Sequence, residues 1–268
     1  MSVREFAAVI SAGLLLAGVP VASAQAAPAA TATVSVLHGV PGATVDVYAN
    51  GKKLLSNFKP GTLTDPLELP EGDYDLKVTA AGQSAALIQA NDVAVPGGAN
   101  VTVVAHLNAG GKPVLTPFVN DTSKLAAGQA RLTVRHTAAA PAVDVRAGGK
   151  PVFTDLTNPK QAKADLPAGT VKADVVLAGT TTVALGPADL NLKEGTNTIV
   201  YAWGSAQSKN LKLAVQSISG LHGNPSGVPG GTGGQAAAQQ QPVWPAVAAG
   251  LLALALVGGG AVALRVRS

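Results

Sequence analysis

The sequence predicts an all-β protein with two tandem immunoglobulin-like antiparallel β-sandwich domains. Three observations support this fold class. The middle of the 268-residue chain repeats itself, and segments of both copies alternate apolar and polar residues as half-buried strands do. Turn signals rich in glycine and proline separate these segments. No stretch between residues 33 and 218 shows a sustained helical period, so we expect no helix there.

The repeat can be followed residue by residue, which indicates two copies of one domain. The register holds over an early strand and a Val-Asp-Val segment, and after a one-residue slip it continues to a late strand. Such agreement in one register predicts the same fold in both copies. The matched segments are 34–38 with 132–136, 45–47 with 143–145, and 100–104 with 197–201.

Each copy is expected to contain seven or eight short strands. The valines of Val45-Asp46-Val47 share one face and the aspartate takes the other, while Asn50-Gly51 and Pro70-Glu71-Gly72 are typical turns. Roughly eight strands in about 90 residues are typical of an immunoglobulin-like sandwich. We place the two copies at residues 33–119 and 130–217.

The N-terminus is predicted to be a secretory signal peptide covering residues 1–26. Arg4 precedes an apolar stretch, which ends in a run of small residues. Two sites of the A-x-A type overlap there, so cleavage is expected after Ala24 or Ala26.

The C-terminus is predicted to anchor the chain in the cell membrane as a single-pass type I protein. Residues 218–242 are rich in glycine, proline and glutamine and form a flexible tether. Residues 243–264 carry no charge and are long enough for a transmembrane helix. The arginines of the tail, residues 265–268, place that tail in the cytoplasm and the β-domains outside it.

Composition excludes several classes of function. The chain has no cysteine, which rules out disulfides, thiolate metal sites, a cysteine nucleophile and a lipoprotein anchor. Sixteen basic and fourteen acidic residues in the part between the two apolar ends leave a net charge of only +2. Such a balance gives no support to nucleic-acid binding.

The candidate site residues are two His and Asp pairs, His38 with Asp46 and His136 with Asp144. Each pair is eight residues apart across a turn, so the side chains could meet on adjacent strands as a ligand-binding pair. A structural role, in which the histidine holds the turn backbone, is favoured because no nucleophile accompanies either pair. One histidine and one carboxylate per copy are too few for a metal, so we expect no metal, cofactor or catalytic residue.

The segment from His38 to Tyr48 carries a family resemblance. Its order is a strand ending in histidine, a turn, Val-Asp-Val and then a Gly-Lys turn, and residues 136–146 repeat that order. This pattern resembles the bacterial extracytoplasmic family called domain of unknown function 4397, over about residues 33–217 in two copies. The resemblance implies β-sandwiches on the cell envelope and brings no established activity.

We therefore expect a non-catalytic, membrane-anchored cell-surface protein whose two β-domains bind or space a component of the cell envelope. The expected partners are a cell-wall polymer or another envelope protein, besides the membrane, and no nucleic acid. Residues 131–216 carry ten basic and six acidic residues against five and seven in 34–119, which suggests an anionic polymer as a target of the second copy. The alternatives are an envelope hydrolase that uses a His/Asp pair, and an accessory subunit of another membrane protein.

Overall fold

The computed structural model describes residues 29–223. The predicted signal peptide, the predicted membrane helix, the tail and the tether from residue 224 onward lie outside the described residues. Within residues 29–223, no helix is long and apolar enough to cross a membrane. These residues are all-β, as predicted.

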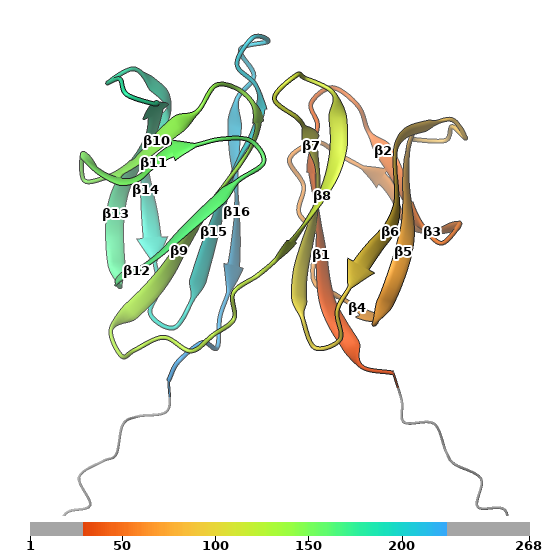
Figure 1. Cartoon of the computed structure of the whole chain (residues 1–268), viewed down its shortest axis with the longest axis horizontal. Coiled ribbons are helices and arrows are strands. Elements are labelled where there is room, and N and C mark those ends of the chain that lie inside the picture. The colour runs from red at the N-terminus through yellow and green to blue at the C-terminus, as the bar shows by residue number, and fades with distance from the viewer. Residues whose placement is uncertain (1–28, 224–268) are drawn as a thin grey trace, which may run out of the picture. The chain divides into compact units, whose positions relative to one another are not determined.

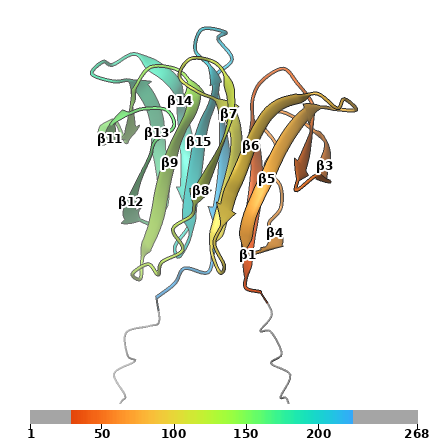
Figure 2. The same cartoon turned by 45° about the vertical axis from the view of Figure 1, so that its right-hand side comes forward.

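The first half of the described chain forms a β-sandwich of two four-stranded sheets. One sheet has the strand order β4-β1-β7-β8 and the other has the order β3-β2-β5-β6. Figure 1 shows these strands in red to yellow, and Figure 2 brings the antiparallel pair of β5 and β6 to the front. The bounds are β1 Thr31–Gly39, β2 Val45–Ala49, β3 Lys52–Phe58, β4 Leu67–Pro70, β5 Gly72–Ala80, β6 Ala86–Val95, β7 Asn100–Leu107 and β8 Pro113–Val119.

The second half repeats this topology, with every strand number raised by eight. Its sheets have the orders β12-β9-β15-β16 and β11-β10-β13-β14 (Figure 1, green to blue). The bounds are β9 Gln129–Ala139, β10 Val143–Ala147, β11 Lys150–Leu156, β12 Gln161–Pro167, β13 Gly169–Leu177, β14 Val183–Leu192, β15 Asn197–Ser205 and β16 Lys212–Ile218.

The strand order of both sandwiches differs from the predicted immunoglobulin-like order. In immunoglobulin domains the first, second, fifth and fourth strands share one sheet. Here the first strand lies between the fourth and the seventh, and it runs parallel to the seventh in both copies. The sequence pattern predicts the sandwich, because alternation reports which face of a strand is buried. It does not report which strands become neighbours.

Alternating residues of the second sandwich build its core as the sequence pattern predicts. Leu132 and Val134 of β9 and Val200 of β15 point into the core between the two sheets. Thr133 and Arg135, at the intervening positions of β9, are nevertheless buried as well. Both faces of β9 are therefore covered, and neither is exposed to solvent.

The second cover on these strands is the other sandwich. Leu37, Val104 and Phe118 of the first copy form one apolar cluster with Ile199 and Tyr201 of the second copy. The β4-β1-β7-β8 sheet and the β12-β9-β15-β16 sheet thus contact each other through the faces that point away from their own cores. The two copies are packed together and do not hang independently on the chain.

The connection between the copies is also fastened to the second sandwich. Leu125 is buried, and its backbone N–H donates a hydrogen bond of 2.7 Å to the carbonyl of Leu221. The N–H of Gly223 donates in turn to the carbonyl of Leu125, at 2.9 Å. Both the linker and the start of the predicted tether are therefore held at one end of this sandwich.

Candidate functional site

His38, the first predicted site residue, is buried and holds the turn that follows β1. Its Nε2 lies 2.8 Å from the carbonyl oxygen of Ala43, and its Nδ1 accepts a weak hydrogen bond of 3.4 Å from the N–H of Val40. The ring also stacks on Phe58. The tautomer with the proton on Nε2 satisfies both nitrogens, and burial lowers the pKa of the ring, so His38 stays neutral.

Asp46 lies on β2 and forms its contacts with β3 and with the turn that follows β5. Its carboxylate accepts hydrogen bonds from the ammonium of Lys53 at 2.7 Å, from the N–H of Asn57 at 3.0 Å and from the N–H of Gly82 at 3.3 Å. The Lys53 bond and the two backbone bonds lower the pKa of Asp46 to about 2. Asp46 is an anion that ties three segments of the first sandwich together.

The second copy places its pair similarly, although Nδ1 of His136 has no hydrogen-bond partner among the described residues. The Nε2 atom of His136 lies 2.9 Å from the carbonyl oxygen of Pro141, and Asp144 accepts the N–H groups of Asp155 and Gly179 at 2.9 and 3.0 Å. Asp144 has no lysine comparable to Lys53, but its backbone partners match those of Asp46.

The structure does not bring either histidine together with its aspartate. Among the described residues, His38 forms no hydrogen bond or ion pair with Asp46, and His136 forms none with Asp144. Both rings are 1% exposed, so a ligand from solvent does not reach them without a change in the fold. The contacts that are present hold turns in place.

Metal binding has no visible basis in the described part of the chain. No group of three or more His, Asp or Glu side chains gathers there in a way that could hold an ion. The carboxylates of Asp46 and Asp144 are each oriented by backbone N–H groups, which are donors and not metal ligands.

A buried network of polar side chains lies between the two sandwiches. Thr102 and Asn120 of the first copy form a closed ring of hydrogen bonds with Arg135, Tyr201 and Gln216 of the second. Around this ring, Arg135 donates to Tyr201 Oη at 2.7 Å, Tyr201 donates to Gln216 Oε1 at 2.5 Å, and Thr102 donates to the same oxygen at 3.0 Å. Asn120 closes it by donating to Thr102 at 3.0 Å and accepting from Arg135 at 2.8 Å.

Arg135 is a buried cation whose hydrogen-bonding partners are all neutral. Besides Tyr201 and Asn120, its guanidinium donates to Gln161 Oε1 at 2.9 Å and lies over the ring of Phe118, 4.5 Å from the centroid. Burial lowers the pKa of Arg135 and raises that of Tyr201. Carbonyl and hydroxyl oxygens and an aromatic face replace water around the guanidinium charge. Some of these groups belong to each copy, so the buried charge has all of its partners only when the two copies are packed together.

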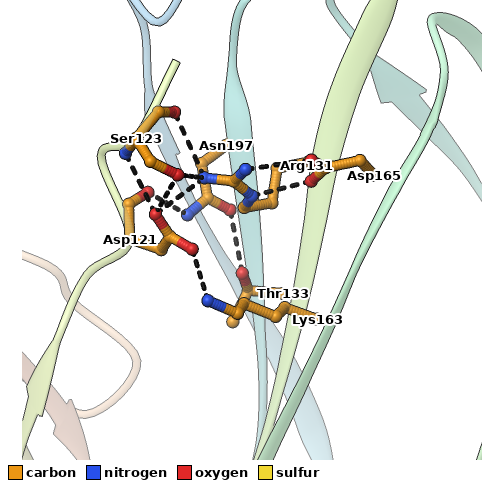
Figure 3. Close-up of polar contacts among 7 residues, drawn as sticks. All are labelled: Asp121, Ser123, Arg131, Thr133, Lys163, Asp165 and Asn197. Carbon is orange, nitrogen blue, oxygen red and sulfur yellow. Dashed lines mark hydrogen bonds and ion pairs between the residues drawn. The ribbon is translucent and has the colours of Figure 1, made fainter. Parts of the chain in front are cut away.

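A second polar cluster joins the linker to the second sandwich (Figure 3). The guanidinium of Arg131 binds Asp165 through two hydrogen bonds, of 2.7 and 3.0 Å, and contacts Ser123 Oγ at 2.9 Å and Asp121 at 2.8 Å. Lys163 also pairs with Asp121. Together with Ser123, these cations lower the pKa of Asp121, so the carboxylate that follows the first sandwich stays charged.

The comparison with family models finds a match in the first half of the chain. Residues 32–146 match the family model "Domain of unknown function (DUF4397)". No curated protein matches the chain significantly. The matched region begins within β1, contains β2 to β9 and ends within β10. It supports the resemblance seen in the sequence, whereas the family assignment of the second copy remains a prediction.

His106 and its counterpart in the second copy, Trp203, lie close together at the contact between the sandwiches. His106 is buried, with its Nδ1 3.0 Å from the carbonyl of Leu107 and its Nε2 2.8 Å from Thr116 Oγ1. Its counterpart Trp203 is 4% exposed and reaches Gly61 of the first copy, where an added Cβ would lie 2.9 Å from the indole ring. The Trp203 ring is therefore a contact residue between the copies.

Sequence reasoning missed the polar residues of this contact. Thr133 and Arg135 alternate with apolar residues on β9, which is also the pattern of a strand with one solvated face. The available signal was the mixture on β15, where Ile199, Tyr201 and Trp203 occupy the face opposite Val200. Apolar residues on both faces indicate a strand that is covered twice.

Proposed function

We propose that this is a non-catalytic, membrane-anchored cell-surface protein whose two β-domains bind or space a component of the cell envelope. The observation that carries the proposal is the buried contact between the sandwiches, with the ring of Thr102, Asn120, Arg135, Tyr201 and Gln216 at its centre. A ring that is complete only across both copies favours one fixed arrangement of the pair.

A rigid pair suits a spacer or a composite binding surface better than two independent modules. Independent modules on a flexible linker gain from avidity, which depends on linker length. Here Leu125 and the cluster around Arg131 fasten the linker itself. We therefore expect both copies to act as one unit, held near the membrane by the predicted helix at 243–264.

The structure reduces the charge difference that suggested an anionic partner. Arg131, Arg146 and Lys163 are engaged in ion pairs, and Arg135 is buried. Six exposed lysines without an ion pair to a described carboxylate remain in the second copy. They are Lys150, Lys160, Lys172, Lys193, Lys209 and Lys212.

The proposal includes no catalytic step and no cofactor. His38 and His136, the groups that a hydrolase would need, hold turn carbonyls and are shielded from solvent. General acid or base catalysis requires a group that can reach a substrate. The expected partner is a cell-wall polymer or another envelope protein.

Co-sedimentation of the full-length protein in detergent with insoluble cell-wall material tests the proposal. Saturable retention at low salt is expected, with weaker retention at high salt because exposed lysines at the surface are screened. A variant with the six lysines changed to glutamine should lose most of this retention.

A matched control changes the exposed lysines of the first copy, Lys52, Lys59 and Lys112, to glutamine. It should be retained like the unchanged protein. If the unchanged protein does not sediment with wall material at either salt concentration, polymer binding is contradicted. Retention that both sets of substitutions lower equally would contradict the assignment to the second copy.

A further inference from the structure

The strands at the sheet edges of the two sandwiches are protected to very different degrees. Exposed edges offer unpaired N–H and C=O groups to another strand, and proteins block them with proline or charge. Most edge strands of the described chain contain a proline. The other protected ones are β3, which begins with two lysines, and β6, which carries Asp92 in an irregular ladder and packs against β8. The prolines are Pro70 in β4, Pro113 and Pro117 in β8, Pro151 in β11, Pro167 in β12 and Pro187 in β14.

The edge strand β16 lacks this protection. It contains no proline, and its single charge is Lys212 at the first position. Leu213 and Val215 are 38% and 50% exposed, among the largest exposures of big apolar side chains in the described chain. An unprotected edge with exposed aliphatic residues is a docking surface for another strand.

The comparison with β8 shows what is missing at this edge. Pro117 pairs with Val103 of β7, and Val215 takes the same place opposite Val200 of β15. A proline leaves the hydrogen bonds between two strands intact only where its nitrogen points away from the neighbouring strand. The N–H of Val215 therefore points away from β15, toward the free side of the edge. At the same place the first copy has a proline, which offers no donor. Because N–H groups alternate along a strand, those of Leu213 and Ser217 point to the free side as well.

The sandwich is also open beside β16. In the first copy β6 lies against β8, and Leu115 of β8 packs into the core. In the second copy β14 and β16 do not pack together in this way, and a cavity of about 230 Å³ lies between the sheets, against about 30 Å³ in the first. Leu213 and Val215 line the mouth of this cavity.

We propose that β16 pairs antiparallel with β16 of a second copy of this chain, about a two-fold axis at Val215. This register places Val215 opposite Val215 of the second copy and Leu213 opposite Ser217. The two Lys212 side chains fall at opposite ends, each opposite an Ile218, so the only charges of the strand do not repel each other. Uncharged side chains of the added strand then face the apolar cavity.

The absence of cysteine makes a direct test possible in the full-length protein in detergent. Directly paired residues of an antiparallel ladder have Cα atoms about 5.5 Å apart, which suits a disulfide. Val215→Cys should form a disulfide-linked dimer on oxidation with diamide. Val119→Cys, at a position of β8 that is 58% exposed, should remain a monomer under the same conditions.

Sedimentation equilibrium of the unchanged protein and of Val215→Pro gives an independent measure. Proline already occupies this ladder position in the first copy, so we expect the variant to keep its fold, which circular dichroism checks. The unchanged protein should sediment with about twice the mass of one chain, and Val215→Pro with the mass of one.

Several results would overturn the pairing. They are a monomer at ~100 µM, a dimer that Val215→Pro leaves intact, and equal cross-linking of both cysteine variants. If the chain is a monomer and the thiol of the Val215→Cys variant reacts readily with maleimide, β16 is exposed and binds a partner other than a second copy. If that thiol does not react, another segment of the same chain covers the edge.

Discussion

The two sandwiches share one topology but use the same positions differently. Leu37 of the first copy and Arg135 of the second stand at equivalent places on their first strands, and both face the other sandwich. His106 and Trp203 form a second such pair, and Phe118 and Gln216 a third. At each of these equivalent positions one copy has an apolar side chain and the other a polar one, so the two copies form unlike sides of the contact.

The difference teaches that a repeated fold does not imply repeated function. Core positions such as Val36 and Val134 keep the same chemistry, because each copy must fill its own sandwich. Positions on the outward face diverge, because the two copies form opposite sides of one contact. The sheet edges diverge as well, with prolines in β8 and none in β16.

The largest effect is expected at Arg135, the buried cation at the contact between the copies. Arg135→Ala should lower the free energy of unfolding by about 3 kcal/mol, because it leaves a cavity and removes donors from Asn120 and Tyr201. Arg135→Leu, which copies Leu37, should cost about half as much because it fills the space. Urea denaturation measures both values, and equal losses would show that volume is unimportant there.

A smaller effect is expected where Trp203 meets the first copy. Gly61→Ala should lower the free energy of unfolding by about 2 kcal/mol, since the new Cβ meets the indole ring and the backbone has a positive φ of 80°. Gly51→Ala is the matched control, with a φ of 77° and nothing within 4 Å. If both variants lose the same stability, backbone strain alone is responsible and the contact with Trp203 adds nothing.

The smallest effect is expected from the histidines. Burial lowers the pKa values of His38, His106 and His136 below 6.5, so below that pH the unfolded chain takes up protons that the folded chain refuses. Stability should therefore fall as the pH is lowered from about 7.5 to about 5.5. His106→Gln should weaken this dependence, as urea denaturation at several pH values measures. An unchanged slope would show that His106 takes up protons equally in the folded and unfolded chains.

Much of the local structure could be predicted from the sequence. Val45-Asp46-Val47 alternates because one face of β2 meets the core, and Asn50-Gly51 forms a turn in which both residues have positive φ. His38 and His136 contact the backbone of the turns that follow their strands. These features depend on residues close together in the chain, so local patterns report them.

The candidate contact between the copies could not be predicted in the same way. Arg135 and Tyr201 are 66 positions apart, and Thr102 and Gln216 are 114 positions apart. Nothing in the neighbourhood of any one of these residues indicates its partner. An arginine that alternates with valine and leucine on a strand has the pattern of a solvated face, whether water or another domain covers it.

The sequence by itself determined the all-β class, the repeat and the turns, because periodicity and backbone preferences act over a few residues. The tertiary structure alone decided which strands became neighbours, that the two sandwiches share a buried face, and that β16 is an edge strand among residues 29–223. These outcomes depend on how distant apolar surfaces are removed from water, and one face can be covered by solvent, by the other copy or by another chain. The same alternating pattern is compatible with all three.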